Sequence, residues 1–75
     1  MESFAVRIKQ LRKERKMTQS DMAAAFGVGV RQYQNYENGK HYPDVPGLMK
    51  IADYFGVTTD YLLGRSERRD GGNAV

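Results

Sequence analysis

The 75-residue sequence has no cysteine, a single histidine and no long apolar run. Without cysteine, neither disulfides nor a zinc-thiolate site can stabilise the fold, and we expect a reducing compartment, the cytoplasm. His41 alone offers neither ligand spacing for a metal nor a convergent catalytic set, so we expect no metal, no cofactor and no enzymatic activity. The apolar runs are shorter than the roughly 18 residues of a membrane-spanning helix. The N-terminus lacks the cationic segment followed by an apolar segment that is typical of a signal peptide.

The charge is distributed unevenly along the chain. The formal net charge is only +3, with a pI of about 9.4. Residues 1–16 hold six basic and two acidic side chains, whereas residues 41–63 hold one lysine and three aspartates. This asymmetry is expected of a chain that meets a polyanion with one face. A solvated helix surface would show the same composition, so both interpretations stay open at this point.

Apolar residues at helical spacing, flanked by capping residues, predict five helices. The expected spans are residues 4 to about 16, 19–26, 30 to about 37, 45–55 and 59–63. The expected N-caps are Ser3, Thr18, Gly29, Asp44 and Thr58, and glycines or asparagine end the helices at Gly27, Asn38, Gly56 and Gly64. The residues expected to face the core are Phe4, Ile8, Leu11, Val30, Tyr33, Tyr36, Val45, Leu48, Met49, Ala52 and Phe55.

The residues after Gly64 have no apolar periodicity. We therefore predict an all-α fold, with a compact five-helix domain over residues 1–64 and a flexible C-terminal tail over residues 65–75. Most of the helices are too short to be stable alone, so tertiary packing must stabilise them.

The connection between the second and third helices has the length of a helix-turn-helix, since only about three residues separate Phe26 from Val30. With the tyrosines of the third helix turned inward, its opposite face displays Arg31, Gln34, Asn35 and Asn38. Arginine can bond guanine O6 and N7, and asparagine or glutamine can bond adenine N6 and N7. The pattern favours DNA as the ligand, although any surface helix can be rich in amides.

Several short motifs are each common, but their combination, in this order and at this spacing, is specific to one family. They are Arg7-Ile8-Lys9-Gln10-Leu11-Arg12, Met17-Thr18-Gln19, Phe26-Gly27-Val28, Tyr36-Glu37-Asn38-Gly39-Lys40, Pro43, Ile51-Ala52-Asp53-Tyr54-Phe55-Gly56-Val57 and Asp60-Tyr61-Leu62-Leu63-Gly64. Over residues 4–64 the sequence resembles the lambda repressor and Cro-like (xenobiotic-response-element type) helix-turn-helix family. It departs from the usual pattern at Gly29, where serine or threonine is common, and at Val30, where a small polar residue is common.

The resemblance implies a role for individual residues. Base contacts are expected from the exposed side of the third helix, at Val30, Arg31, Gln34 and Asn35. Phosphate contacts are expected at Gln19, Gln32, Asn38, Lys40 and His41. A structural ion pair is expected between Arg12 and Glu37.

The resemblance also implies a function. We expect a sequence-specific regulator of transcription, most commonly a repressor, that binds a double-stranded operator as a homodimer. The fifth helix and the end of the fourth would form the dimer interface through Tyr54, Tyr61 and Leu62. No small-molecule effector is evident. The alternative is a protein-interaction module on the same scaffold, such as an antitoxin-like or adaptor domain, because a fold does not fix a function.

Overall fold

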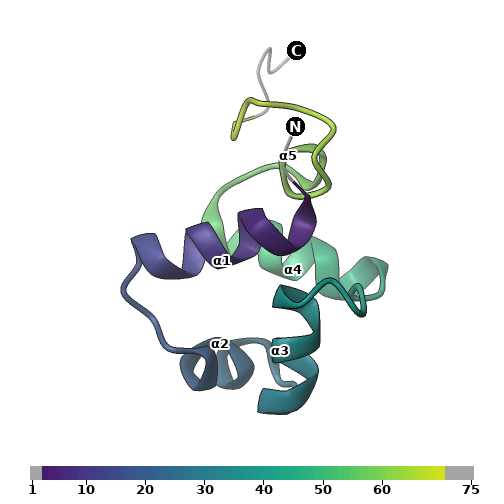
Figure 1. Ribbon diagram of the computed structural model, residues 1–75. Helices are drawn as coiled ribbons and strands as arrows, with labels where there is room; N and C mark the ends of the chain where they lie inside the picture. The colour runs from purple at the N-terminus through teal and green to yellow at the C-terminus, as the bar shows by residue number, and fades with distance from the viewer. Residues whose placement is uncertain (1–2, 71–75) are drawn as a thin grey trace.

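A computed structural model of the protein describes residues 3–70, and within this range it contains helices and no strand. The helices are α1 (Phe4–Glu14), α2 (Gln19–Phe26), α3 (Val30–Glu37), α4 (Val45–Phe55) and α5 (Thr59–Leu62). The predicted all-α fold with five helices is confirmed. In Figure 1, α2 and α3 form one end of the molecule and α5 lies at the other, with α1 and α4 between them. No helix among residues 3–70 has the length and apolarity needed to cross a bilayer.

Four of the predicted N-caps are confirmed by hydrogen bonds from side chain to backbone. In each, a hydroxyl or carboxylate oxygen accepts from the backbone N–H three residues later, which satisfies a donor that the helix itself leaves unpaired. At Thr18 the bond is reciprocal, because the Asp21 carboxylate accepts from the Thr18 N–H at 2.8 Å. The four capping residues are Ser3, Thr18, Asp44 and Thr58.

Two helices end earlier than the sequence predicts. The first stops at Glu14 rather than near residue 16, because Lys16 adopts a left-handed conformation with φ +56°. The Met17 N–H then bonds back to the Arg12 carbonyl at 3.1 Å, which closes the helix end and directs the chain into α2. The fifth stops at Leu62, one residue before the expected end.

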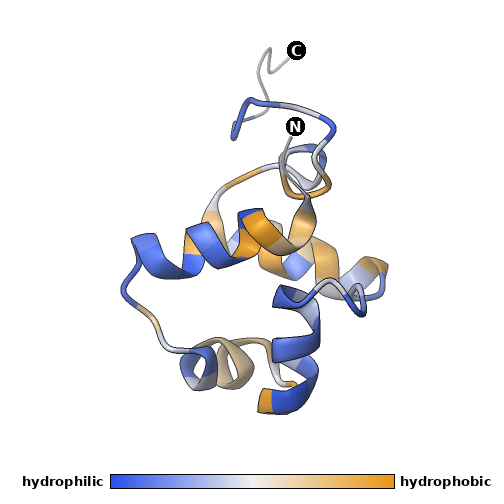
Figure 2. Ribbon diagram, viewed as in Figure 1, coloured by the Kyte–Doolittle hydropathy of each residue, from blue (hydrophilic) through white to orange (hydrophobic). Residues whose placement is uncertain are grey.

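The core forms where the apolar faces of all five helices meet. In Figure 2, hydrophobic and hydrophilic segments alternate along α1, and α4 also carries hydrophobic segments. Most of the expected core residues are buried, including Phe4, Ile8, Leu11, Tyr33, Tyr36, Ala52 and Phe55.

Three residues expected in the core are exposed instead. Val45 is 69% exposed, Met49 is 54% exposed and Val30 is 41% exposed. All three lie in the first half of their helices, and in α4 full burial begins only at Ile51. Helical spacing places these side chains on an apolar stripe, but in the folded chain no other segment buries this end of it.

Arg7 is buried, although the other basic side chains of α1 are not. Its side chain is 2% exposed, because it lies on the same face of α1 as the buried Phe4, Ile8 and Leu11. The guanidinium lies 4.0 Å from the centroid of the Tyr61 ring and donates to the carbonyls of Tyr61 and Ser66. Arg7 therefore joins α1 to α5 and to the segment that follows it.

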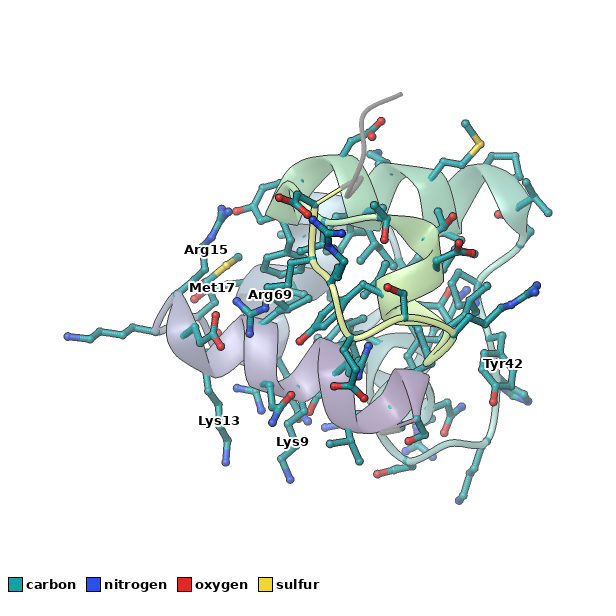
Figure 3. All side chains as sticks on the ribbon, turned by 90° about the horizontal axis from the view of Figure 1, so that it is seen from above. Lys9, Lys13, Arg15, Met17, Tyr42 and Arg69 are labelled. Carbon is teal, nitrogen blue, oxygen red and sulfur yellow. The ribbon has the colours of Figure 1, made fainter. Side chains whose placement is uncertain are left out.

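Residues 65–70 fold back onto the helices. Arg69 lies across α1 in Figure 3, and its guanidinium donates to both carboxylate oxygens of Glu14, at 2.8 and 2.7 Å. The Arg69 carbonyl accepts from the Thr58 N–H at 2.8 Å. The sequence prediction of a flexible tail from residue 65 did not anticipate these contacts, and residues 71–75 lie outside the described range. We propose that the folded unit extends to Asp70.

A pair of truncations tests this boundary. A chain ending at Asp70 should match the full chain in thermal stability, whereas a chain ending at Gly64 should lose about 1 to 3 kcal/mol of unfolding free energy. The loss follows because the shorter chain removes the Ser66 acceptor of Arg7 and the Arg69 partner of Glu14. Urea unfolding measures both variants. Equal stability of the two would place the boundary at Gly64.

The expected dimer patch on the fifth helix is also corrected. Tyr61 and Leu62 are buried in the core, because α5 packs against both α1 and α4. Of the three residues predicted for this patch, only Tyr54 at the end of α4 is substantially exposed. A second copy of the chain cannot reach Tyr61 or Leu62 without opening the core.

Candidate nucleic-acid interface

The link between α2 and α3 is a tight turn. Gly27 adopts a left-handed conformation with φ +68°, and the Val28 N–H bonds back to the Ala23 carbonyl at 3.0 Å. This geometry closes the end of α2 and favours glycine, which has no Cβ to strain. The third helix then begins at Val30 and packs against both α2 and α1. Figure 1 shows α2 and α3 meeting at a steep angle at one end of the molecule.

The tyrosines of α3 hold the helix against the core and thereby select its outward face. Tyr33 and Tyr36 are both buried, and their rings meet edge to face. Arg31 and Gln32 are exposed, and Gln34 and Asn35 are half-buried. Val30 is exposed, contrary to its expected place in the core but consistent with its expected contact to a base. In Figure 2, the visible surface of α3 is hydrophilic apart from its N-terminal end.

The single carboxylate of α3 is turned inward, away from this face. The Glu37 side chain is 3% exposed and forms an ion pair with Arg12 of α1, with 2.6 Å between Arg12 Nε and Glu37 Oε2. Tyr33 also donates its hydroxyl to Glu37. The structure thus brings Arg12 and Glu37 together, and it leaves the outward face of α3 without a negative charge.

The environment of Glu37 keeps it ionised. Burial by itself raises the pKa of this carboxyl. Hydrogen bonds from Arg12, Tyr33 and Gln19 lower the pKa by more than burial raises it, so the net shift of the pKa is downward. The pKa of Tyr33 is raised, first by burial and then by its bond to Glu37. At neutral pH Glu37 is therefore a carboxylate that accepts a hydrogen bond, and Tyr33 is a phenol that donates it.

Gln19 stands at the first position of α2 and connects this ion pair to the outward face of α3. Its amide nitrogen donates to Glu37 Oε1 at 3.1 Å, and its amide oxygen accepts from the Gln34 amide nitrogen at 3.1 Å. The sequence motifs indicated a role for Gln19 in binding phosphate but not this contact with Gln34. The contact depends on the angle between two helices, and no sequence spacing indicates that angle.

The remaining predicted contact residues lie on α3 itself or beyond its end. Gln32 donates its amide to the Tyr36 hydroxyl at 3.0 Å and stays exposed. Asn38, Lys40 and His41 are also exposed, in the turn that follows α3. This turn is held because the N–H groups of Lys40 and His41 both donate to the Asn35 carbonyl. The predicted residues therefore lie on α2, on α3 and in the turn that follows α3.

A family model described as helix-turn-helix matches residues 8–62 of the chain, which is most of its length. The chain belongs to the helix-turn-helix family. The predicted resemblance to the lambda repressor and Cro-like members is confirmed by the relatives and by the fold.

Two curated relatives illustrate the likeness of the helix-turn-helix domain. The transcriptional regulator ImmR of Bacillus subtilis is 35% identical over 65 residues, which are 87% of this chain and 51% of that protein. The CTXphi phage repressor RstR of Vibrio cholerae is 36% identical over 64 residues, which are 85% of this chain and 58% of that protein. The chain thus spans about half the length of the curated relatives it matches. Both are named as regulators, not as enzymes.

Among solved structures, the P22 c2 repressor shares the fold. The repressor chain, solved in complex with a synthetic operator, superposes with a TM-score of 0.80 and is 23% identical. The match covers 88% of this chain and all of that one. The similarity shows that the arrangement of helices in the two domains is the same.

Proposed function

We propose that this chain binds double-stranded operator DNA in a sequence-specific way and thereby regulates transcription, as a repressor. The observation that supports this most directly is the outward face of α3, which displays arginine and amide side chains while its carboxylate is paired inward with Arg12. Such a face is attracted to the phosphate backbone and offers hydrogen-bonding groups to base edges in the major groove. The names of the relatives support regulation of transcription, and one of them is named a repressor.

In this proposal α3 lies in the major groove and α2 crosses the backbone. Arg31, Gln34 and Asn35 contact base edges, and Val30 contacts an apolar group such as a thymine methyl. The phosphate contacts come from Gln19 and Gln32 and from the exposed turn that holds Asn38, Lys40 and His41. The first N–H groups of α2 are oriented toward the same backbone, where a helix N-terminus favours an anion.

We further propose that the chain binds as a homodimer. Tyr54 at the end of α4 remains exposed as expected, and Leu63 just after α5 is exposed in place of the buried Tyr61 and Leu62. Two-fold symmetry would place the two α3 helices about 34 to 36 Å apart, one turn of the duplex, and would require a nearly palindromic operator. In bacteria, the source of the curated relatives above, such a protein acts in the cytoplasm, where the DNA is.

Selection of bound sequences from a random pool of duplexes tests the proposal. The selected sites should contain inverted half-sites, and Arg31→Ala should remove the base preference at one position per half-site. The loss at that position should be about 1 to 3 kcal/mol, because a bidentate contact to guanine disappears. Arg65→Ala is the matched control, since Arg65 is an exposed arginine that closely follows α5, and α5 lies at the opposite end of the molecule from α2 and α3. Equal weakening of Arg31→Ala on every sequence would make Arg31 a phosphate contact, and an unenriched pool would refute the proposal.

A further inference from the structure

The geometry points to a positioning role for Glu37 in base recognition: acting through Gln19, it determines which end of the Gln34 amide faces the DNA. Gln34 then presents its carbonyl oxygen and selects adenine over guanine at the base that it contacts. This inference rests on the proposed function, since it concerns how the same face of α3 distinguishes operators.

The chain of hydrogen bonds starts at a group that can only accept. The Glu37 carboxylate receives four hydrogen bonds, two of them from Arg12, one from Tyr33 and one from Gln19. An ionised carboxylate has no proton to donate. The Gln19 side chain must therefore turn its NH₂ group toward Glu37, because the reverse orientation would bring two acceptors together.

The orientation of Gln19 then decides that of Gln34. With its nitrogen 3.1 Å from Glu37 Oε1, Gln19 directs its carbonyl oxygen at Gln34. A carbonyl oxygen also only accepts. Gln34 must therefore turn its NH₂ group toward Gln19, at 3.1 Å, and the two amides form a line in which every donor meets an acceptor.

This arrangement leaves a defined edge of Gln34 for the ligand. One N–H of its amide is used on Gln19, so the carbonyl oxygen and the second N–H remain for a base. Adenine presents the complementary pair in the major groove, a donor at N6 and an acceptor at N7. Guanine presents two acceptors, O6 and N7, so a Gln34 carbonyl held in place would face another acceptor. An isolated glutamine could rotate its amide to avoid this conflict, whereas Gln34 cannot do so without breaking its bond to Gln19.

The test measures affinity for selected operators in which single base pairs are changed. The base pair that Gln34 contacts is the one whose preference disappears in Gln34→Ala. At that base pair, the wild type should bind adenine about tenfold more tightly than guanine, within the usual range for an amide contact. When adenine is replaced by a purine without the 6-amino group, the wild type should bind that operator as weakly as it binds the operator with guanine.

Gln19→Met is the decisive variant, because it keeps the length of the side chain and removes both of its hydrogen bonds. We expect its preference for adenine over guanine at this base pair to fall to about two- to threefold, with the preference at the Arg31 position unchanged. Glu37→Gln is a second variant, since a neutral amide can donate as well as accept and so releases the orientation of Gln19. Provided that it remains folded, it should lose the same preference.

The outcomes separate this inference from the proposed function. If Gln19→Met weakens binding to all operators by one common factor and leaves the adenine preference intact, Gln19 only contacts phosphate and the inference is wrong. It is also wrong if Gln34→Ala changes no base preference while the wild type still binds its selected operator. A wild type that binds no duplex in dilute buffer would instead refute the proposed function.

Discussion

Glu37→Ala should lower the free energy of unfolding by about 3 to 5 kcal/mol, because it leaves the Arg12 guanidinium buried without its carboxylate partner. The substitution also removes the acceptor for the Tyr33 hydroxyl and the Gln19 amide. A domain of this size has a total stability of roughly 4 to 11 kcal/mol, so a large fraction of the molecules would unfold. Thermal and urea unfolding measure the change. An unaltered melting temperature would contradict the structural role of the pair.

The double variant Arg12→Met, Glu37→Leu is the control for this prediction. It removes both charges together, and apolar side chains of similar size can replace a buried ion pair at little cost. We therefore expect the double variant to be more stable than Glu37→Ala, although it lacks the whole ion pair. If it is less stable, the loss comes from packing around Glu37 and not from the unpaired guanidinium.

The pH dependence of unfolding gives an independent check. The pKa of Glu37 is lower in the folded chain than its ordinary value of 4.5, so the folded state favours the ionised form. Its contribution to stability is present above that ordinary value and is lost as the pH falls below it toward the folded pKa. Wild-type stability should decrease more steeply in this acidic range than that of the double variant, which has no carboxyl at position 37.

Operator affinity should fall about a thousandfold when the salt concentration rises from 50 to 200 mM. This estimate assumes that a dimer neutralises about six phosphates, since log K changes by about −0.9 per log unit of salt for each contact. Lys40, the exposed lysine in the turn after α3, is the first candidate for these contacts. Fluorescence anisotropy over a series of salt concentrations gives the slope directly.

Lys40→Ala should reduce this slope by about two units, because a dimer loses one phosphate contact in each of its two copies. It should weaken binding equally on all sequences, because a phosphate contact has no base preference. Arg65→Ala, at the other end of the molecule, should leave the slope unchanged. A flat salt dependence, together with tight binding to a protein, would favour the alternative in which the scaffold is a protein-interaction module.

Much of the local structure follows from the sequence because it depends on residues close together in the chain. The hydroxyl of Thr18 reaches an N–H three residues away in any helix that starts there, so the cap can be recognised without knowing the fold. The same is true of Gly27, whose left-handed conformation ends α2 wherever that helix lies. These short-range interactions determined where the helices are, and the order of the motifs determined the family.

The outward face of α3 was also predictable, but only in part. The burial of two tyrosines at helical spacing sets which side of the helix faces solvent, and Arg31 and Asn35 lie outside the core as expected. Val30 shares the apolar spacing and is nevertheless exposed. Periodicity identifies an apolar stripe on one helix, but how much of that stripe is covered depends on the length and angle of its neighbours.

Only the tertiary structure decided the contacts between residues far apart in sequence. Arg7 is buried because the Tyr61 ring and two backbone carbonyls surround its guanidinium, and these carbonyls lie 54 and 59 residues further along the chain. The line from Glu37 through Gln19 to Gln34 requires α2 and α3 to meet at one angle, and hydrogen bonds need their donors and acceptors within about 3 Å. The sequence alone therefore determined the helices and the family, and helix packing determined which polar groups meet and which of them remain on the outward face of α3.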